Sequence, residues 1–436
     1  MNLSLNYLRN KNFAIYGLGT TGRSVINYFH KYGFKNYVGW DDDIKVFKRF
    51  QGTKYKKIKN FFLRSLNYVD YIIVSPGINI NKAKLKKILL KNRKKIITDL
   101  DLFYLLNPNI KSIVVTGTNG KSTTCKIIDH VLRKNNINTA LGGNIGSPIL
   151  NLNLHKKSLI VIEASSFQLA YSKFIKPDYA LILNITKDHL DWHGSMDSYI
   201  ESKFKIFSLQ QKNNFALINN KKLLKKFKKH KYESKIKFIT TNKYKKIKNK
   251  IKNKYLKSEV NEENMSFVYT LSKMLKIKEK SFIKSLKSFN GLAHRHEIFY
   301  KNNNKIFVND SKATSFEATR YALKNNKNIF WIVGGYPKMG DQFKINKLKK
   351  NIIKAYIIGK HMKIFKKFLN GKIEFKLCKT LKNAVVAIIK DTKKIKNKEI
   401  TVLLSPASAS YDQFKNFENR GDKFKKLVKI YGKKFF

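Results

Sequence analysis

Residues 112–134, SIVVTGTNGKSTTCKIIDHVLRK, join an apolar β-branched run to a small-residue loop and then to an amphipathic pattern. This order predicts a strand, a loop and a helix, which is the setting that a P-loop requires. Glycines let backbone N–H groups face a phosphate, and the helix N-terminus adds partial positive charge. Val115 stands where the common GxxxxGK[ST] pattern has its first glycine, so the motif is a variant. The stretch predicts a nucleotide-binding α/β domain that uses ATP.

The loop itself supplies the first candidate binding residues. Lys121 can reach a terminal phosphate, and Ser122 can bind Mg²⁺. The remaining candidates around the phosphates are Gly117, Thr118, Asn119, Gly120 and Thr123. An ordinary glycine-rich turn between strand and helix is the alternative, and the combination of strand, GK[ST] and helix favours the nucleotide.

Length and composition indicate a multidomain globular protein. The chain has 436 residues, of which 42% are hydrophobic. No apolar run approaches the ~18 residues that span a bilayer, and the first residues lack the order of a signal peptide, so we expect a cytoplasmic protein without membrane insertion. Cys125 and Cys378 are far apart in sequence, which indicates neither a disulfide framework nor a zinc site.

The charge is strongly positive, with 91 Lys+Arg against 28 Asp+Glu and a formal net charge of +63. Such a value ordinarily indicates a nucleic-acid or membrane partner. Here the positive charge is spread along a chain rich in Lys, Asn, Ile, Phe and Tyr, the residue set of A/T-rich codons. We therefore expect no specific nucleic-acid partner, and a basic P-loop ATPase bound to nucleic acid stays as an alternative.

The chain shows the βα alternation of parallel sheets covered by helices, repeated in three segments. The predicted fold class is α/β with three domains: a Rossmann-like N-terminal unit (1–97), a central P-loop ATPase-type sheet (98–292) and a Rossmann-like C-terminal unit (293–436). Strands are predicted at 13–17, 36–42, 71–77, 112–117, 159–166, 179–186, 214–220, 236–241, 305–310, 328–335, 355–360 and 401–410. Helices are predicted at 82–92 and 261–275, and the lysine-rich residues 221–257 should form a solvated helix and loop around one of the strands.

A second glycine-rich turn, GLGTTGRS (17–24), follows the first predicted strand and matches GxGxxG. On its own this motif is weak. It could serve a nicotinamide dehydrogenase with Asp41 or Asp42 on a ribose, hold the pyrophosphate of another nucleotide, or be a structural turn.

Further motifs carry a resemblance to a known family. GTNGKST, GNIG (143–146) and TKDHLDWHGSMDSYIESK (186–203) look like the central domain of the Mur ligases, ATP-dependent amide-forming enzymes of peptidoglycan precursor synthesis. EASSFQL (163–169), NDSKATS (309–315) and LLSPASASYDQFKNFENRGDKF (403–424) resemble the members that add D-glutamate. Another amide ligase of the Mur or folylpolyglutamate type is the rival interpretation.

The resemblance implies an activity and its substrates. The alanyl carboxylate of UDP-N-acetylmuramoyl-L-alanine would attack the ATP γ-phosphate, and D-glutamate would displace phosphate from the acyl phosphate. Lys121, His189 and Lys203 are the implied catalytic residues. Ser122 and Glu163 would bind one Mg²⁺, and His189 would bind a second one together with Lys203, which members of the family carbamylate. From the sequence alone, Glu163 could pair with a lysine, His189 could be a packed or surface residue, and Lys203 is not distinguished from Lys205.

The other implied site residues fall into three groups. For ATP they are Asn261, Asn264, Arg295, Asp310 and Lys312, with Val260 where the family usually has histidine. For D-glutamate they are Thr314, Lys338, Ser410 and Phe417. For the UDP-substrate they are Thr21, Asp41, Ser75, Pro76, Gly77, Asn144 and Ser165, with Asp41 not separated from Asp42 or Asp43. The first unit would then bind the UDP-substrate, the second ATP, and the third D-glutamate, and we expect a monomer.

Overall fold

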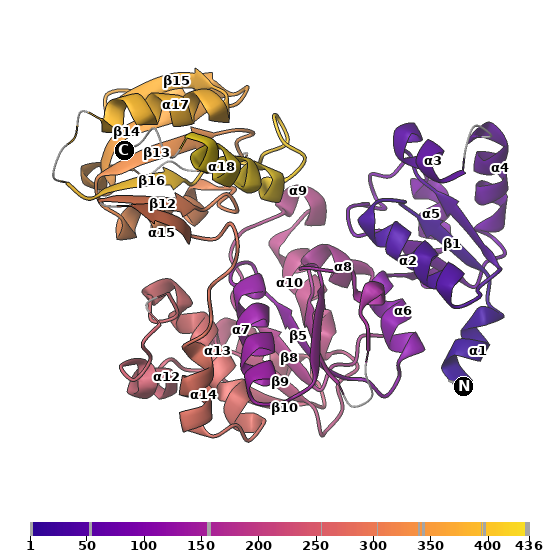
Figure 1. The fold of residues 1–436 in the computed structure, drawn as a ribbon. Helices are drawn as coiled ribbons and strands as arrows, with labels where there is room; N and C mark the ends of the chain where they lie inside the picture. Colours follow the sequence, from indigo (N-terminus) through magenta and orange to yellow (C-terminus); the bar gives the residue numbers. More distant parts are fainter. Residues whose placement is uncertain are drawn as a thin grey trace. The chain divides into compact units, whose positions relative to one another are not determined.

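The computed structural model describes residues 3–51, 55–154, 158–253, 255–302, 304–338, 341, 345–393, 395 and 398–431. The chain divides into two compact units, which we call unit 1 (residues 1–289) and unit 2 (residues 290–436). Unit 1 holds two sheets and unit 2 holds one (Figure 1). Each unit is described by itself.

The N-terminal sheet of unit 1 has four parallel strands in the order β2-β1-β3-β4. The strands are β1 (Phe13–Tyr16), β2 (Tyr37–Trp40), β3 (Tyr71–Val74) and β4 (Ile96–Ile97). The helices of this part are α1 (Leu3–Arg9), α2 (Thr20–Lys31), α3 (Ile44–Gln51), α4 (Tyr55–Ser65), α5 (Lys86–Lys91) and α6 (Asp99–Leu106), with a 3₁₀ turn η1 (Arg93–Lys95). Every residue of β1 is buried, as expected for a central parallel strand covered on both faces.

The central sheet of unit 1 has six parallel strands in the order β10-β9-β8-β5-β7-β6. They are β5 (Lys111–Thr116), β6 (Thr139–Gly143), β7 (Leu159–Glu163), β8 (Tyr179–Ile182), β9 (Phe215–Ile218) and β10 (Lys235–Phe238). The helices are α7 (Lys121–Lys134), α8 (Ser166–Tyr171), α9 (Leu190–His193), α10 (Met196–Phe204), α11 (Lys221–Lys229), α12 (Asn242–Lys248), α13 (Glu259–Met274) and α14 (Glu279–Leu286), with 3₁₀ turns η2 (Ile149–Asn151) and η3 (Lys205–Phe207). From β5 the chain crosses to β6 at one edge of the sheet, and from β7 it passes to β8 on the other side of β5. Ligands of open α/β sheets bind at such a switch point.

Within unit 1 the two sheets share one continuous hydrophobic core. Polar contacts reinforce it between residues far apart in sequence. Asn79 Nδ2 donates to Trp192 O at 2.7 Å, and Ile80 N donates to the Tyr171 hydroxyl at 2.9 Å. The loop after β3 is therefore held against the central domain.

Unit 2 is a six-stranded sheet in the order β11-β12-β16-β13-β14-β15, in which all pairs are parallel except β11 with β12. Its strands are β11 (Glu297–Asn302), β12 (Lys305–Asn309), β13 (Ile329–Gly334), β14 (Ile352–Ile358), β15 (Phe375–Lys379) and β16 (Ile400–Leu404). Its helices are α15 (Phe316–Asn325), α16 (Met362–Leu369), α17 (Leu381–Thr392) and α18 (Phe417–Tyr431), with a 3₁₀ turn η4 (Lys349–Asn351).

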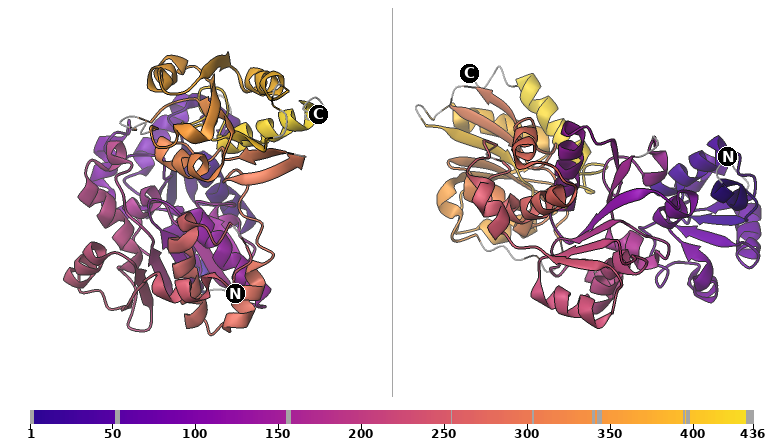
Figure 2. Two further views of the ribbon diagram at one scale, coloured as in Figure 1. Left: turned by 90° about the vertical axis from the view of Figure 1, so that its left-hand side faces the viewer. Right: turned by 90° about the horizontal axis from the view of Figure 1, so that it is seen from below.

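The sheet of unit 2 is covered on both faces (Figure 2). Trp331 packs on one face in a core with α15 and α16, and its neighbour Ile332 packs on the other with α17 and α18. Successive side chains of a strand point to opposite faces, so a strand that is apolar throughout is what a doubly covered sheet requires.

The predicted α/β fold class is confirmed, and the predicted strands are present, each at least in part. Four strands were missed, of which β4 (Ile96–Ile97) has only two residues. β6 (TALGG) is rich in small residues, β15 (FKLCK) alternates with lysine at an edge, and β11 pairs antiparallel, so the expectation of a purely parallel sheet in unit 2 is wrong. The helix predicted from residue 82 begins only at Lys86. The domain boundaries at 97 and 292 stay predictions.

Candidate active site

The loop between β5 and α7 has the backbone that its glycines suggest. Gly117 has φ +148° and Gly120 has φ +82°, a region that side chains other than glycine rarely adopt. Lys121 opens α7 and folds back over the loop, where Nζ donates to Gly117 O at 2.9 Å and to Thr118 O at 2.8 Å. The ammonium group of Lys121 thus lies over the loop at the N-terminus of α7. An anionic phosphate needs positive charge at this place.

A residue that the motif does not contain holds this loop in place. Asn184 follows β8; its carbonyl accepts from Thr118 N at 2.7 Å, and its Oδ1 accepts from Asn119 N at 2.8 Å. The Thr118 hydroxyl also lies 2.9 Å from the Tyr199 hydroxyl. Asn184 was missed because its only sequence signal is its place directly after a strand of the central sheet.

Asn261 and Asn264 lie on α13 beside the loop. They are 3% and 4% exposed, so neither is a surface residue. Asn264 Nδ2 donates to Asn261 Oδ1 at 3.1 Å. A Cβ atom at Gly120 would lie 2.2 Å from Asn264 Oδ1, which places this amide directly against the loop. The side chain of Val260 lies outside the described residues.

Glu163 ends β7, the strand next to β5, and is 2% exposed. Its Oε1 accepts from Asn144 Nδ2 at 2.7 Å. Its Oε2 is buried and has no hydrogen-bond partner within the described residues, and no ion pair there joins it to a lysine. A buried carboxylate oxygen without a donor is unfavourable unless a cation binds it, so this residue fits a divalent metal ligand.

Lys203 lies on α10 and is 1% exposed. Its Nζ donates to Gly117 O at 2.9 Å and to Thr116 Oγ1 at 3.4 Å. Burial first, and then the charge of Lys121, lower the pKa of Lys203 well below its ordinary value. Lys205 instead donates to Ala170 O. The structure therefore separates two lysines that the sequence does not.

His189 and its neighbours border the same region. His189 has φ +53°, its Nε2 lies 3.4 Å from Asp188 Oδ2, and its ring lies 4.6 Å from that of Phe167. The Asp188 carboxylate acts electrostatically on Lys203, so it lies within reach of the buried amine. The His193 Nε2 lies 3.0 Å from Ser166 Oγ, and burial, with the charge of Lys203, lowers the pKa of His193 to about 4.

A cavity of about 800 Å³ opens at the carboxyl ends of β1 and β3. Six of the seven residues expected to hold the UDP-substrate line it: Thr21, Asp41, Ser75, Pro76, Gly77 and Asn144. Ser165 does not; its hydroxyl caps α8 and lies 3.1 Å from Gln168 Oε1. Asp42, the alternative to Asp41, also lines the cavity, and lining residues that the sequence did not suggest include Lys82, Asp99, Gln168 and Trp192.

The turn after β1 is closely packed. Gly17 has φ +96°, and a Cβ atom at Gly22 would lie 2.0 Å from Gly17 O. The structure also separates the aspartates, because Asp41 Oδ2 accepts from Leu18 N in the turn at 2.7 Å, whereas Asp42 accepts from the Tyr16 hydroxyl. Asp41 is thus the carboxylate that touches the turn.

Unit 2 places its candidates at the carboxyl ends of its parallel strands. Asp310 follows β12; Oδ2 accepts from Ser405 Oγ at 2.6 Å, Oδ1 accepts from His296 N at 3.0 Å, and burial raises its pKa to about 7. Lys312 Nζ lies 3.8 Å from the centroid of the Phe417 ring. The Arg295 charge opposes this rise in the pKa of Asp310.

The remaining D-glutamate candidates lie on loops of unit 2. Ser410 is 2% exposed, Thr314 is half-buried and Lys338 is exposed. The small-residue run 405–410 forms a loop and no helix.

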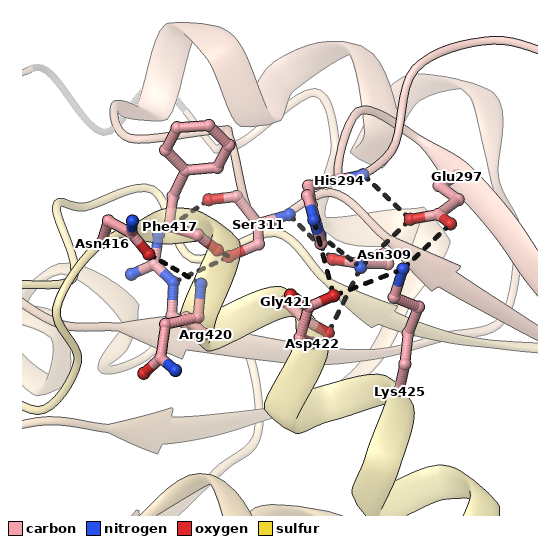
Figure 3. A network of polar contacts seen from close by, with 11 residues as sticks. His294, Glu297, Asn309, Ser311, Asn416, Phe417, Arg420, Gly421, Asp422 and Lys425 are labelled. Atoms are coloured by element: carbon pink, nitrogen blue, oxygen red, sulfur yellow. Dashed lines mark hydrogen bonds and ion pairs between the residues drawn. The ribbon is translucent and has the colours of Figure 1, made fainter. Parts of the chain in front are cut away.

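His294 was missed although its neighbour Arg295 was chosen (Figure 3). The Nδ1 atom of His294 lies 3.0 Å from Asn309 Nδ2, and a Cβ atom at Gly421 would lie 2.2 Å from His294 Nδ1. The segment before β11 is thereby seated on α18.

Two family models and several known relatives match this chain. The Mur ligase MurD-like N-terminal domain matches residues 11–97, and the Mur ligase middle domain matches residues 115–282. UDP-N-acetylmuramoylalanine–D-glutamate ligase of Rickettsia felis is 35% identical, covering 98% of each chain. The chain belongs to the Mur ligase family. The enzyme of the same name from a Caulobacter species is 32% identical, covering 97% of this Mur ligase and 97% of that chain.

Solved structures share the fold of this Mur ligase. The MurC ligase of Thermotoga maritima superposes with a TM-score of 0.56 at 16% identity, covering 97% of this chain and 100% of that one. The MurF ligase of Thermotoga maritima, solved in complex with ADP, gives a TM-score of 0.54 at 17% identity over 89% of this chain and 93% of that one. Among the described helices, none has the length and apolar character to cross a membrane.

Proposed function

We propose that this Mur ligase adds D-glutamate to UDP-N-acetylmuramoyl-L-alanine in peptidoglycan precursor synthesis, with conversion of ATP to ADP and phosphate. The observation that carries the proposal is a relative of that name, 35% identical over 98% of both chains. The half-buried Lys121 and the buried Glu163 and Lys203 around the phosphate loop support the same chemistry.

The chemical difficulty is electrostatic, because a carboxylate must attack a triphosphate. Lys121 at the head of α7 offsets charge on the phosphates, and the backbone N–H groups of the loop position them. The alanyl carboxylate then attacks the γ-phosphorus and ADP leaves. The amine of D-glutamate attacks the acyl phosphate through a tetrahedral intermediate and releases phosphate.

The residues around the loop would hold two Mg²⁺ ions. Glu163, with its unpaired Oε2, and Ser122 would hold one ion, which would neutralise charge between the phosphates. His189 would hold the second together with Lys203 as a carbamate. Carbamylation needs a neutral amine, and the burial that lowers the pKa of Lys203 favours that form.

The remaining roles follow the placement of the side chains in each unit. In unit 1, ATP would contact Gly117, Thr118, Asn119, Gly120, Thr123, Asn261 and Asn264. For Arg295, Asp310 and Lys312 of unit 2, contact with ATP is what the family resemblance implies. The UDP-substrate would occupy the cavity lined by Thr21, Asp41, Ser75, Pro76, Gly77 and Asn144, with Ser165 acting through α8. D-Glutamate would contact Thr314, Lys338, Ser410 and Phe417. We propose that the enzyme acts in the cytoplasm as a monomer.

The test is ADP release by purified protein with Mg²⁺. We expect release only when UDP-N-acetylmuramoyl-L-alanine and D-glutamate are both present, together with a product heavier by one glutamyl residue. L-Glutamate is the matched control and should give no product. Release that needs no amino acid and is stimulated by DNA at low salt would favour the nucleic-acid ATPase instead.

A further inference from the structure

Arg420 lies in the first turn of α18 and is 0% exposed. Its guanidinium forms two hydrogen bonds with Ser311, which lies on the loop after β12 (Figure 3). Nε donates to Ser311 Oγ at 3.0 Å and Nη2 donates to Ser311 O at 2.8 Å. Its Nη1 is buried and has no hydrogen-bond partner in the part of the chain that the structure describes. The fork therefore binds both the side chain and the backbone of Ser311.

This arrangement is a poor one for stability alone. No ion pair joins Arg420 to a carboxylate among the described residues, and burial, opposed by the charge of Asp412, lowers the pKa of its guanidinium to about 10. Arg420 also places a positive charge near the positive end of the helix dipole. Buried charges can often be replaced by apolar groups without loss of stability, so what the fork positions matters more than its own energy.

Ser311 stands between two of the candidate nucleotide residues, Asp310 and Lys312. Its hydroxyl donates to Phe417 O at 2.8 Å, and Lys312 Nζ lies over the Phe417 ring. Arg420 therefore ties the loop after β12 to the start of α18, where the candidate D-glutamate residue Phe417 lies.

The Nη1 atom of Arg420, which has no hydrogen-bond partner among the described residues, lies near the end of a further strand, β13. A Cβ atom at Gly335 would lie 3.4 Å from Arg420 Nη1 and 2.5 Å from Ala409 O. Gly335 follows β13 and leads to Lys338, and Ala409 follows β16 and leads to Ser410. The guanidinium thus lies where loops from β12, β13 and β16 meet.

We propose that Arg420 is a positioning residue for the acceptor step: it holds residues 310–312 against Phe417, so that the ATP side and the amino-acid side of unit 2 form one rigid constellation. The inference rests on the proposed D-glutamate ligase function and assigns no contact with substrate to Arg420. Lysine offers its donors from one nitrogen and cannot reproduce the spacing of the two nitrogens that meet Ser311, and methionine offers no donor, so Arg420→Lys should fall between wild type and Arg420→Met.

The kinetic test separates the three substrates. For Arg420→Met we expect the KM for D-glutamate to rise at least tenfold, with kcat reduced, while the KM for the UDP-substrate, whose cavity is in unit 1, changes less than twofold. Ser311→Ala should raise the same KM, and the double variant should be no worse than Arg420→Met. Lys425→Met is the matched control on α18, since Lys425 pairs with Glu297, and it should stay within twofold of wild type.

Hydrogen exchange gives a second readout that needs no activity. Without substrates, Arg420→Met should exchange the amides of residues 310–314 and 413–418 at least tenfold faster than wild type, while those of β14 stay unchanged. If wild type shows no D-glutamate-dependent ADP release, the proposed function fails, and exchange still tests the fork. Unchanged exchange, an unchanged KM for D-glutamate, or an equal rise in all three KM values from general unfolding would overturn the proposal.

Discussion

The two glycine-rich turns of unit 1 use the same backbone in opposite electrostatic settings. Each follows the strand at a switch point of a parallel sheet, β1 in one and β5 in the other, and each leads into a helix. In the first turn a carboxylate, Asp41, takes a backbone N–H. In the second, Lys121 folds over the loop and Lys203 is buried beneath it.

The difference teaches that composition does not set the charge of a site. In a chain of net charge +63, the cavity at the first turn is lined by Asp41, Asp42, Asp99 and Asp191 and by a single lysine, Lys82. Carboxylates accept hydrogen bonds from sugar hydroxyls and base N–H groups, and the turn itself can hold a diphosphate. Phosphoryl transfer at the second turn needs cations, because negative charge must be offset as the bond forms.

The largest effect is expected at the second turn. Lys121→Met should lower kcat by about 10²–10³ or more, because it removes the cation that offsets phosphate charge. Steady-state ADP release measures kcat, and binding of the UDP-substrate to the first turn should be unchanged in calorimetry. A kcat within tenfold of wild type would show that Lys121 is not what gives the second turn a catalytic role that the first turn lacks.

The first turn can be broken by one methyl group. Gly22→Ala would place a Cβ atom 2.0 Å from Gly17 O, so we expect a loss of about 1–3 kcal/mol in unfolding free energy from overpacking. The KM for the UDP-substrate should rise about tenfold or more, since small misplacements of binding groups are costly. The KM for ATP should stay near wild type.

Gly19→Ala is the matched control for the unfolding free energy, because a Cβ atom there has no neighbour within 4 Å. Gly19 lines the cavity, so this variant is not a control for the KM of the UDP-substrate. Urea unfolding and initial rates measure both variants. Equal behaviour of the two would contradict the close packing of the turn.

The smallest effect concerns pH at the first turn. Burial raises the pKa of Asp99 from 3.8 to about 6, and its carboxylate meets Gln168 Nε2 only at 3.4 and 3.5 Å. As pH rises through about 6, a negative charge appears in a cavity that must accept an anionic diphosphate. The KM for the UDP-substrate should therefore increase about threefold to tenfold between pH 5 and 7.

Asp99→Asn should flatten that profile. The free energy of unfolding also decreases as pH rises. The contribution of Asp99 to it is fully present below about pH 4 and is lost as pH rises through about 6. A pH profile identical in wild type and variant would exclude Asp99 as its source.

How far the sequence reached depended on how local the signal was. The strand, loop and helix at residues 112–134 were predicted because consecutive residues carry the whole pattern. β11 and β15 are edge strands, which are recognised by the strand that they pair with, and their own composition carries little signal. The sequence therefore did not predict them. Asn184, Asp99 and His294 gave no motif, since each acts on a residue distant in sequence.

The sequence by itself determined the phosphate loop, the α/β class and the family, because these depend on contiguous patterns and on similarity along the chain. Only the tertiary structure decided which lysine is buried beside the loop, which carboxylate oxygen lacks a partner, and which arginine holds Ser311. Burial and pKa depend on neighbours that the fold brings together from separate strands, and no local pattern encodes them.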